Sequence, residues 1–201
     1  MAGIAAGTRV GVAPEATIRA IKVLNCDGGS SWLAVLAGMS WAAKNKTGPS
    51  IASMSLGGGY SQSVNLATAN LASLMPVSIA AGNNNADASN YSPSSSTAAG
   101  AITVGATTSS DARASYSDYG SLVDVFAPGS NVYSTNPCSQ STACTCTNCY
   151  SVCLNFDFAM YVCCDSSSFF FVQTKSVFIP PTSFLFVCFL TLLSFIYRAH
   201  P

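Results

Sequence analysis

Three short apolar segments, each followed by small or polar turn residues, most constrain the fold of this chain. They are Thr17–Leu24, Ile51–Ser55 and Val77–Ala81. Nearly continuous apolar strands are typical of parallel sheets that are covered on both faces. Two stretches of helix length separate the three segments. The order strand, helix, strand, helix, strand therefore predicts an α/β fold built on a mostly parallel sheet.

The first helical stretch begins at Trp32 and continues with apolar residues at the spacing of one helix face. Ser30 or Ser31 precedes it and is predicted to cap its N-terminus. The predicted core face consists of Val35, Leu36, Met39 and Ala43. The second helix is expected over Ser63–Met75, because Pro76 ends it.

Three further strands are predicted at Ala101–Gly105, Leu122–Phe126 and Asn131–Ser134. Sites in open α/β sheets form beyond the carboxyl ends of the strands. Leu56–Gly59 and Gly82–Asn85 each follow a predicted strand, so the pattern predicts a cleft at this edge of the sheet.

Asn83 stands at the tip of the turn after the third strand. A carboxamide held there can donate a hydrogen bond to a developing oxyanion. Asparagine is also a common turn residue because it tolerates left-handed backbone, so a purely structural role remains open. The glycines of Leu56–Gly59 fit neither the Gly-x-Gly-x-x-Gly nor the P-loop pattern, which argues against nucleotide binding.

The composition argues against electrostatic partners and divides the chain in two. Only 8% of the residues are charged and the formal net charge is zero, which disfavours binding to nucleic acid or to an anionic membrane surface. Residues 1–135 are rich in Ala, Gly and Ser and contain one cysteine, Cys26. All other cysteines lie in residues 136–201, together with most of the phenylalanines.

We interpret residues 136–201 as an unrelated Cys/Phe-rich tail, disordered or translated from an intron or a shifted frame. Its cysteines do not form the two Cys-x-x-Cys pairs of a zinc site, because Cys146–Cys149 is a single such spacing, and no histidine is nearby. A disulfide framework would require export. The apolar run at residues 182–197 predicts a short helix; a membrane anchor is the alternative, although a span needs about 20 apolar residues.

Seven motifs in this order resemble the subtilisin-like serine proteases (peptidase family S8), in particular their proteinase K-type branch. The motifs are Gly11–Pro14, Ala20–Leu24, Ser53–Tyr60, Ala80–Asn85, Asn90–Pro93, Ile102–Ala106 and Asp124–Gly129. The resemblance covers Met1 to Thr135. It implies a partial peptidase domain over residues 1–135, with a subtilisin-like three-layer fold that is incomplete at both ends.

The resemblance also implies roles for individual residues. Asn83 matches the asparagine that donates to the oxyanion, and Asp124 matches a carboxylate that binds structural calcium in some members. The matching substrate-binding positions are Ser55, Leu56, Gly57 and Gly58 on the strand that pairs with the substrate, Ala80, Ala81 and Gly82 in the primary specificity pocket, and Trp32 beside a distal subsite.

The catalytic Asp, His and Ser of the family have no counterpart in the 201 residues. The only histidine, His200, lies in the tail, and nothing in the sequence orients it toward a nucleophile. We therefore predict an inactive fragment of a serine endopeptidase. The alternative is a non-catalytic peptide-binding pseudoprotease, tethered to a membrane through the apolar run of the tail.

For partners and location, the resemblance implies a peptide or protein substrate and secretion in the parent family. It implies no required cofactor, and structural calcium in some members of the family. Residues 1–7 show neither the basic segment nor the long apolar segment of an export signal. The location of this chain is therefore left open.

Overall fold

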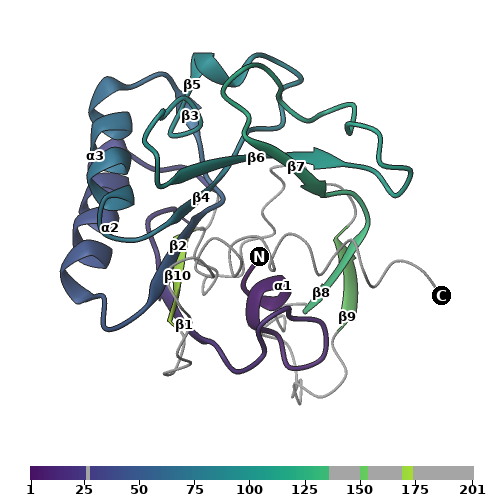
Figure 1. The fold of residues 1–201 in the computed structure, drawn as a ribbon, viewed down its shortest axis with the longest axis horizontal. Coiled ribbons are helices and arrows are strands. Elements are labelled where there is room, and N and C mark those ends of the chain that lie inside the picture. The colour runs from purple at the N-terminus through teal and green to yellow at the C-terminus, as the bar shows by residue number, and fades with distance from the viewer. Residues whose placement is uncertain (26–27, 136–149, 154–168, 174–201) are drawn as a thin grey trace.

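The structure is a computed structural model that describes residues 1–25, 28–135, 150–153 and 169–173. Figure 1 shows a central sheet with two helices side by side on one face and a short helix on the other side. In chain order, the elements are α1 (Ala2–Ala6), β1 (Thr17–Ile21), α2 (Trp32–Asn45), β2 (Ser50–Met54), β3 (Gly58–Gly59), α3 (Gln62–Ala72), β4 (Val77–Ala80), β5 (Tyr91–Ser92), β6 (Ala101–Thr107), β7 (Val125–Pro128), β8 (Val132–Thr135), β9 (Tyr150–Cys153) and β10 (Phe169–Gln173).

The main sheet is mostly parallel, as predicted. Its strand order is β1-β10-β2-β4-β6-β7, and the pairs β2–β4, β4–β6 and β6–β7 are all parallel. Alternate residues of the central strands are buried, including Met54 on β2 and Ile79 on β4. The α/β fold class expected from the sequence is confirmed.

The core lies between this sheet and the helix pair α2 and α3. Burying one large aliphatic side chain contributes about 1.5–3 kcal/mol, so this layer is the main source of stability. Its members include Val35 and Met39 from α2, Val64 and Leu71 from α3, and Met54, Val77 and Ile79 from the sheet.

Helix α2 begins where the capping pattern predicted. The Ser31 hydroxyl accepts a hydrogen bond from the Ala34 N–H at 3.3 Å. Val35 and Met39 of the predicted face are buried, and Leu36 and Ala43 are partly buried and pack against the core. Ala42 is fully buried as well, so the buried face is wider than predicted by this one residue.

The predicted strand at residues 122–126 begins later, at Val125. The Val123 N–H donates to the Gly120 carbonyl at 3.2 Å, so the preceding residues form a turn instead. Asp124 is the first residue after this turn, and its N–H donates to the Thr103 carbonyl at 2.9 Å.

Two strands of the described structure come from the tail. β10 lies between β1 and β2 and runs antiparallel to both, and β9 pairs antiparallel with β8. The remainder of the tail lies outside the described residues, including the apolar run at 182–197 and His200. Within the described part of the chain, no helix is long and apolar enough to cross a bilayer.

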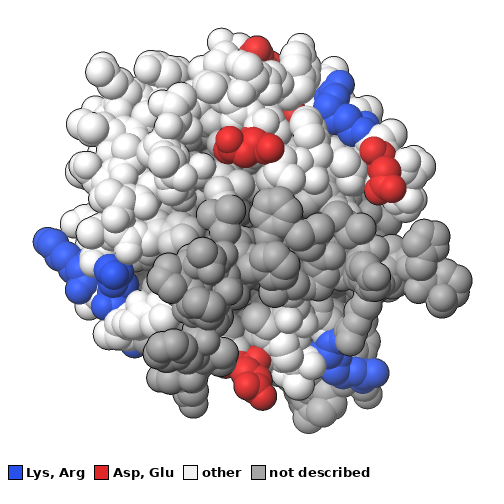
Figure 2. Space-filling model, viewed as in Figure 1, with Lys and Arg blue, Asp and Glu red and all other residues white. Residues whose placement is uncertain are grey.

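Charged side chains are few on the face shown in Figure 2. The described lysines, arginines and acidic residues stand in small, separate groups there, without a broad area of one sign.

Candidate functional site

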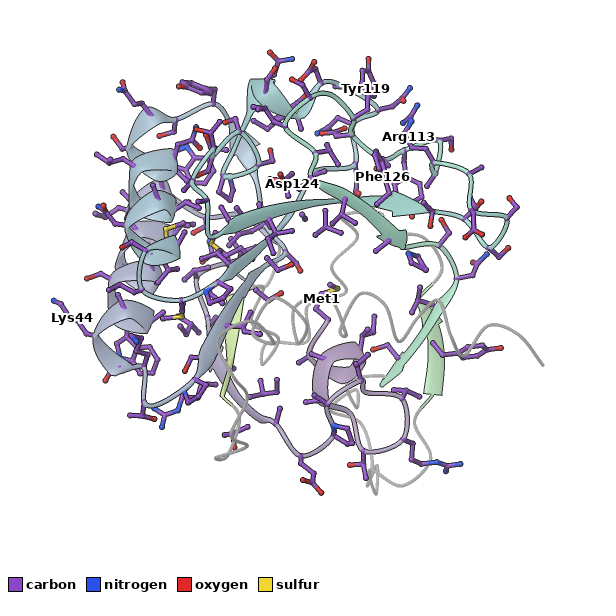
Figure 3. All side chains as sticks on the ribbon, in the orientation of Figure 1. Met1, Lys44, Arg113, Tyr119, Asp124 and Phe126 are labelled. Carbon is purple, nitrogen blue, oxygen red and sulfur yellow. The ribbon has the colours of Figure 1, made fainter. Side chains whose placement is uncertain are left out.

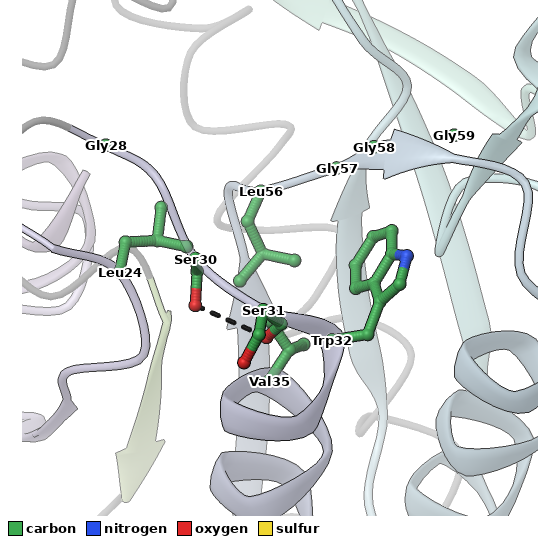
Figure 4. A pocket seen from close by; sticks show the side chains of 10 residues that line it. All are labelled: Leu24, Gly28, Ser30, Ser31, Trp32, Val35, Leu56, Gly57, Gly58 and Gly59. Atoms are coloured by element: carbon green, nitrogen blue, oxygen red, sulfur yellow. Dashed lines mark hydrogen bonds between the residues drawn. The ribbon is translucent and has the colours of Figure 1, made fainter.

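A cavity of about 260 Å³ lies at the carboxyl ends of β1 and β2 (Figure 4). It is bounded by the segment after β1, the first turn of α2 and the segment that leads into β3. The lining residues are Leu24, Gly28, Ser30, Ser31, Trp32, Val35, Leu56, Gly57, Gly58 and Gly59. The lining side chains are apolar apart from two serines at one side, but the lining surface as a whole is polar and apolar in about equal parts.

Trp32 and Gly58 define one wall of the cavity. A Cβ atom placed on Gly58 would lie 2.9 Å from Cζ2 of the Trp32 ring, so glycine is what allows the indole to approach the strand. Gly58 and Gly59 form β3, which pairs antiparallel with β5. Among the described strands β3 has no second partner, so one of its edges is without a paired strand.

The Asn83 loop begins where β4 ends, at Ala80. Ala81 is buried, and Gly82 adopts a φ of +124°, a conformation that glycine tolerates and other residues rarely adopt. Asn83 is half-buried just beyond this turn. The chain then continues through Asn84 to Asp87, whose carboxylate caps the short 3-10 helix Ala88–Asn90.

The structure brings some of the predicted site residues together. Trp32, Leu56, Gly57 and Gly58 all line the cavity. Ser55 and the residues from Ala80 to Asn83 are not among its lining residues. Met54 on β2 is the register partner of Ile79 on β4, so the two segments leave the same edge of the sheet on neighbouring parallel strands.

Asp124 is exposed and already has a backbone partner. Its Oδ2 atom accepts a hydrogen bond from the Thr103 N–H at 2.7 Å, which joins the start of β7 to β6. Figure 3 shows it beside these strands. Within the described residues, no group of three or more His, Cys, Asp or Glu side chains could hold a metal ion. Calcium at Asp124 stays a prediction.

Two hydrogen bonds from Ser89 hold the pKa of Asp87 below its usual range. The larger effect comes from the backbone N–H of Ser89 and the smaller one from its hydroxyl. The Asp87 carboxylate is therefore charged at neutral pH.

The sequence analysis did not identify Asp118. This residue is fully buried, and its carboxylate contacts the Asn83 loop from a segment more than thirty residues away. The local sequence Tyr116–Gly120 has no pattern that predicts such a contact. Of the other residues that line the cavity, Gly28 was not identified from the sequence, and Ser30 was identified only as a candidate helix cap.

Comparison with known proteins supports the resemblance. The Subtilase family model matches residues 1–154. Alkaline serine exoprotease A of Vibrio alginolyticus is 48% identical over 135 residues, which cover 67% of this chain and 25% of that protein. Proteinase R of Parengyodontium album is 48% identical over 140 residues, covering 67% and 36% respectively.

A solved structure agrees with the sequence matches. The crystal structure of a cold adapted subtilisin-like serine proteinase superimposes with a TM-score of 0.64 at 45% identity, covering 66% of this chain and 48% of that one. The chain spans about a quarter to a third of the length of the curated relatives described above. With the family model matching most of its length, the chain belongs to the subtilase family of serine proteases and is similar to its proteinase K-type members.

Proposed function

We propose that the described part of this chain is the substrate-binding and oxyanion-stabilising portion of a subtilisin-like serine endopeptidase, and that the 201-residue chain does not cleave peptides on its own. The observation that carries the proposal is the strand edge at Gly57–Gly59, which leads directly from the cavity beside Trp32. The proposal includes export of this protein from the cell, because a similar protein, Extracellular serine proteinase of Thermus sp., is 47% identical over 135 residues.

An extended peptide can bind by adding a strand to an unpaired edge. The segment Gly57–Gly59 carries no side chains that would obstruct such a strand, and β3 pairs with β5 on one side only. Typical pockets for drug-sized ligands measure about 300–1,000 Å³. A cavity of about 260 Å³ suits a single substrate side chain better than a whole small molecule.

In the proposed reaction, the carboxamide of Asn83 donates the hydrogen bond that stabilises the oxyanion. In subtilisin, a member of the same family, deleting the asparagine that donates to the oxyanion lowers turnover by about 10²–10³-fold. Asn83 stands beyond the carboxyl end of β4, at the same sheet edge as Ser55. A substrate strand along Ser55–Gly58 would therefore bring a carbonyl group to the side of the cleft that Asn83 occupies.

The reaction also requires a nucleophile and a base. Acyl transfer in this family uses Ser, His and Asp together, and binding plus oxyanion contacts alone leave only about 10³–10⁴-fold acceleration over water. The single histidine of the 201 residues is His200, which lies outside the described structure. We therefore assign substrate binding and oxyanion stabilisation to this chain, without the nucleophile and the base.

An activity assay tests this assignment. We expect the purified chain to leave a fluorogenic peptide uncleaved and to remain unlabelled by a serine-directed fluorophosphonate, with Proteinase R as the positive control. The Asn83→Ala variant distinguishes hydrolysis by this chain from hydrolysis by a contaminating protease, because the substitution should reduce only the former. Hydrolysis that the fluorophosphonate abolishes and that falls in Asn83→Ala would overturn the proposal of inactivity.

The alternative is a peptide-binding protein that performs no reaction. The unpaired edge of β3 and the adjacent cavity favour it as well, because both serve binding. In a Trp41→Phe variant, Trp32 is the only tryptophan left and reports on the cavity by fluorescence. A saturable change on addition of an uncleaved peptide would support binding; a flat titration would contradict both proposals for this surface.

The role of Asp124 can be tested separately from calcium. Replacing it with alanine removes the acceptor of the Thr103 N–H, so we expect the free energy of unfolding to fall by about 1 kcal/mol. If the hydrogen bond to Thr103 is the whole role of Asp124, thermal unfolding in excess EDTA and in excess calcium will show the same loss. A loss that appears only in calcium would instead make Asp124 a calcium ligand whose other ligands are carbonyls or water.

A further inference from the structure

Asp118 is a carboxylate in an unusual environment. It lies in the connection between β6 and β7 and is fully buried. Aspartate is almost never fully buried unless its charge is compensated by partners. In this structure the partners of Asp118 are backbone groups of the Asn83 loop.

The contacts of Asp118 lie on both sides of Asn83. Its backbone N–H donates to the Gly82 carbonyl at 3.0 Å. Its Oδ1 atom accepts from the Asn84 N–H at 2.7 Å and from the Ala86 N–H at 3.0 Å. One residue thus holds the peptide groups before and after Asn83, and two anchored peptide planes restrict the direction of the side chain between them.

The second carboxylate oxygen has no hydrogen-bond partner. Oδ2 is buried and faces Gly82, where an added Cβ atom would lie only 2.2 Å from it. Leaving a buried polar atom unpaired is unfavourable for stability. The position therefore retains a destabilising feature next to the loop, which is typical of groups kept for function.

Neighbouring residues hold the same loop in place. Arg113 donates to the Asn85 side-chain oxygen at 3.0 Å and also to the Ser117 carbonyl. The Asn85 N–H donates to the Tyr116 carbonyl at 2.9 Å, and the guanidinium of Arg113 lies 5.1 Å from the centre of the Tyr119 ring. Figure 3 shows Arg113 and Tyr119 at the same end of the molecule. Among these contacts, those of Asp118 are the ones that flank Asn83 directly.

We propose that Asp118 is a positioning residue that holds the Asn83 carboxamide in the orientation required to donate to the oxyanion. This inference rests on the proposed role of Asn83. Preorganised donors stabilise a transition state because no reorientation is needed at the moment of reaction. Asp118 supplies that order through the backbone on either side of the donor, without contacting the substrate.

The test compares Asp118→Ala, Asp118→Asn and the matched control Asp124→Ala, which removes a carboxylate that accepts one backbone N–H outside the loop. In Asp118→Ala, we expect the Asn84 and Ala86 amides to exchange with solvent roughly tenfold faster or more, because a hydrogen bond to a charged group is worth at least that factor. The side-chain amide resonance of Asn83, measured with ¹⁵N-asparagine, should shift and broaden. Asp118→Asn retains an oxygen acceptor and should restore both signals.

Three outcomes would overturn the inference: wild-type exchange and an unchanged Asn83 resonance in Asp118→Ala, no rescue by Asp118→Asn, or equal loosening of the loop in Asp124→Ala. If Asp118→Ala does not fold, Asp118→Asn carries the test, and loss of amide protection in that variant contradicts the inference. None of these readouts requires hydrolysis. A flat peptide titration at Trp32 would therefore remove the proposed function while leaving the result on Asp118 intact.

Discussion

Replacing Gly82 with alanine should lower the free energy of unfolding by about 2–5 kcal/mol. The backbone at this position has a φ of +124°, which costs an L-residue about 1–2 kcal/mol. The new Cβ atom would also lie 2.2 Å from Oδ2 and 2.9 Å from Cγ of Asp118. Asp118 is fully buried, so it cannot move into solvent to relieve the overlap, and overpacking of this kind costs about 1–3 kcal/mol more.

Gly48→Ala is the matched control, measured by urea and thermal unfolding. Gly48 also has a positive φ, +68°, but no atom lies within 4 Å of the position of an added Cβ. The control therefore measures the backbone cost alone, about 1 kcal/mol. The difference between the two variants combines the steric contact with Asp118 and the higher backbone cost of a φ of +124° compared with +68°. Equal losses in the two variants would show that Asp118 does not pack against Gly82.

Replacing Phe171 with proline should destabilise the sheet by about 2–4 kcal/mol and reduce the yield of soluble monomer. Phe171 is the middle residue of β10 and is opposite Arg19 on one side and Ala52 on the other. Proline cannot donate to a ladder hydrogen bond, and the acceptor left without a donor costs about 1–3 kcal/mol. A disrupted strand between β1 and β2 would also expose edges that promote aggregation.

Phe171→Ala is the control, because it retains the backbone N–H. Thermal unfolding and size-exclusion chromatography of the two variants isolate the contribution of the backbone ladder. If the proline variant unfolds at the same temperature as the alanine variant, β10 does not contribute a central strand. That result would support the interpretation of residues 136–201 as sequence unrelated to the fold.

Local patterns predicted most of the elements in residues 1–135. The apolar segment of β4, the cap at Ser31 and the spacing of Val35 and Met39 are all properties of residues close together in the chain. Backbone conformation and helix amphipathicity depend mainly on such neighbours, so these features followed from the sequence. The alternation of strands and helices then restricted the fold to a parallel α/β arrangement.

The candidate site was predictable in part. The turn that carries Asn83 and the glycines of β3 were recognised from short motifs, and the structure places the glycines at a cavity with Trp32. The wall that Trp32 and Gly58 form was not predictable, because it depends on a contact between two separate elements. Asp124 was predicted as a calcium ligand, whereas its contact with Thr103 emerged only from the folded chain.

The amino-acid order specifies where strands and helices form and which turns carry polar groups, because these depend on interactions between near neighbours. The position of β10 between β1 and β2 and the contacts of Asp118 around Asn83 depend on residues far apart in the chain. No local pattern encodes such pairings, since their free energy arises only when distant segments are brought together and desolvated. The residues of the turn that carries Asn83 can thus be identified from the sequence, whereas their orientation is a property of the fold.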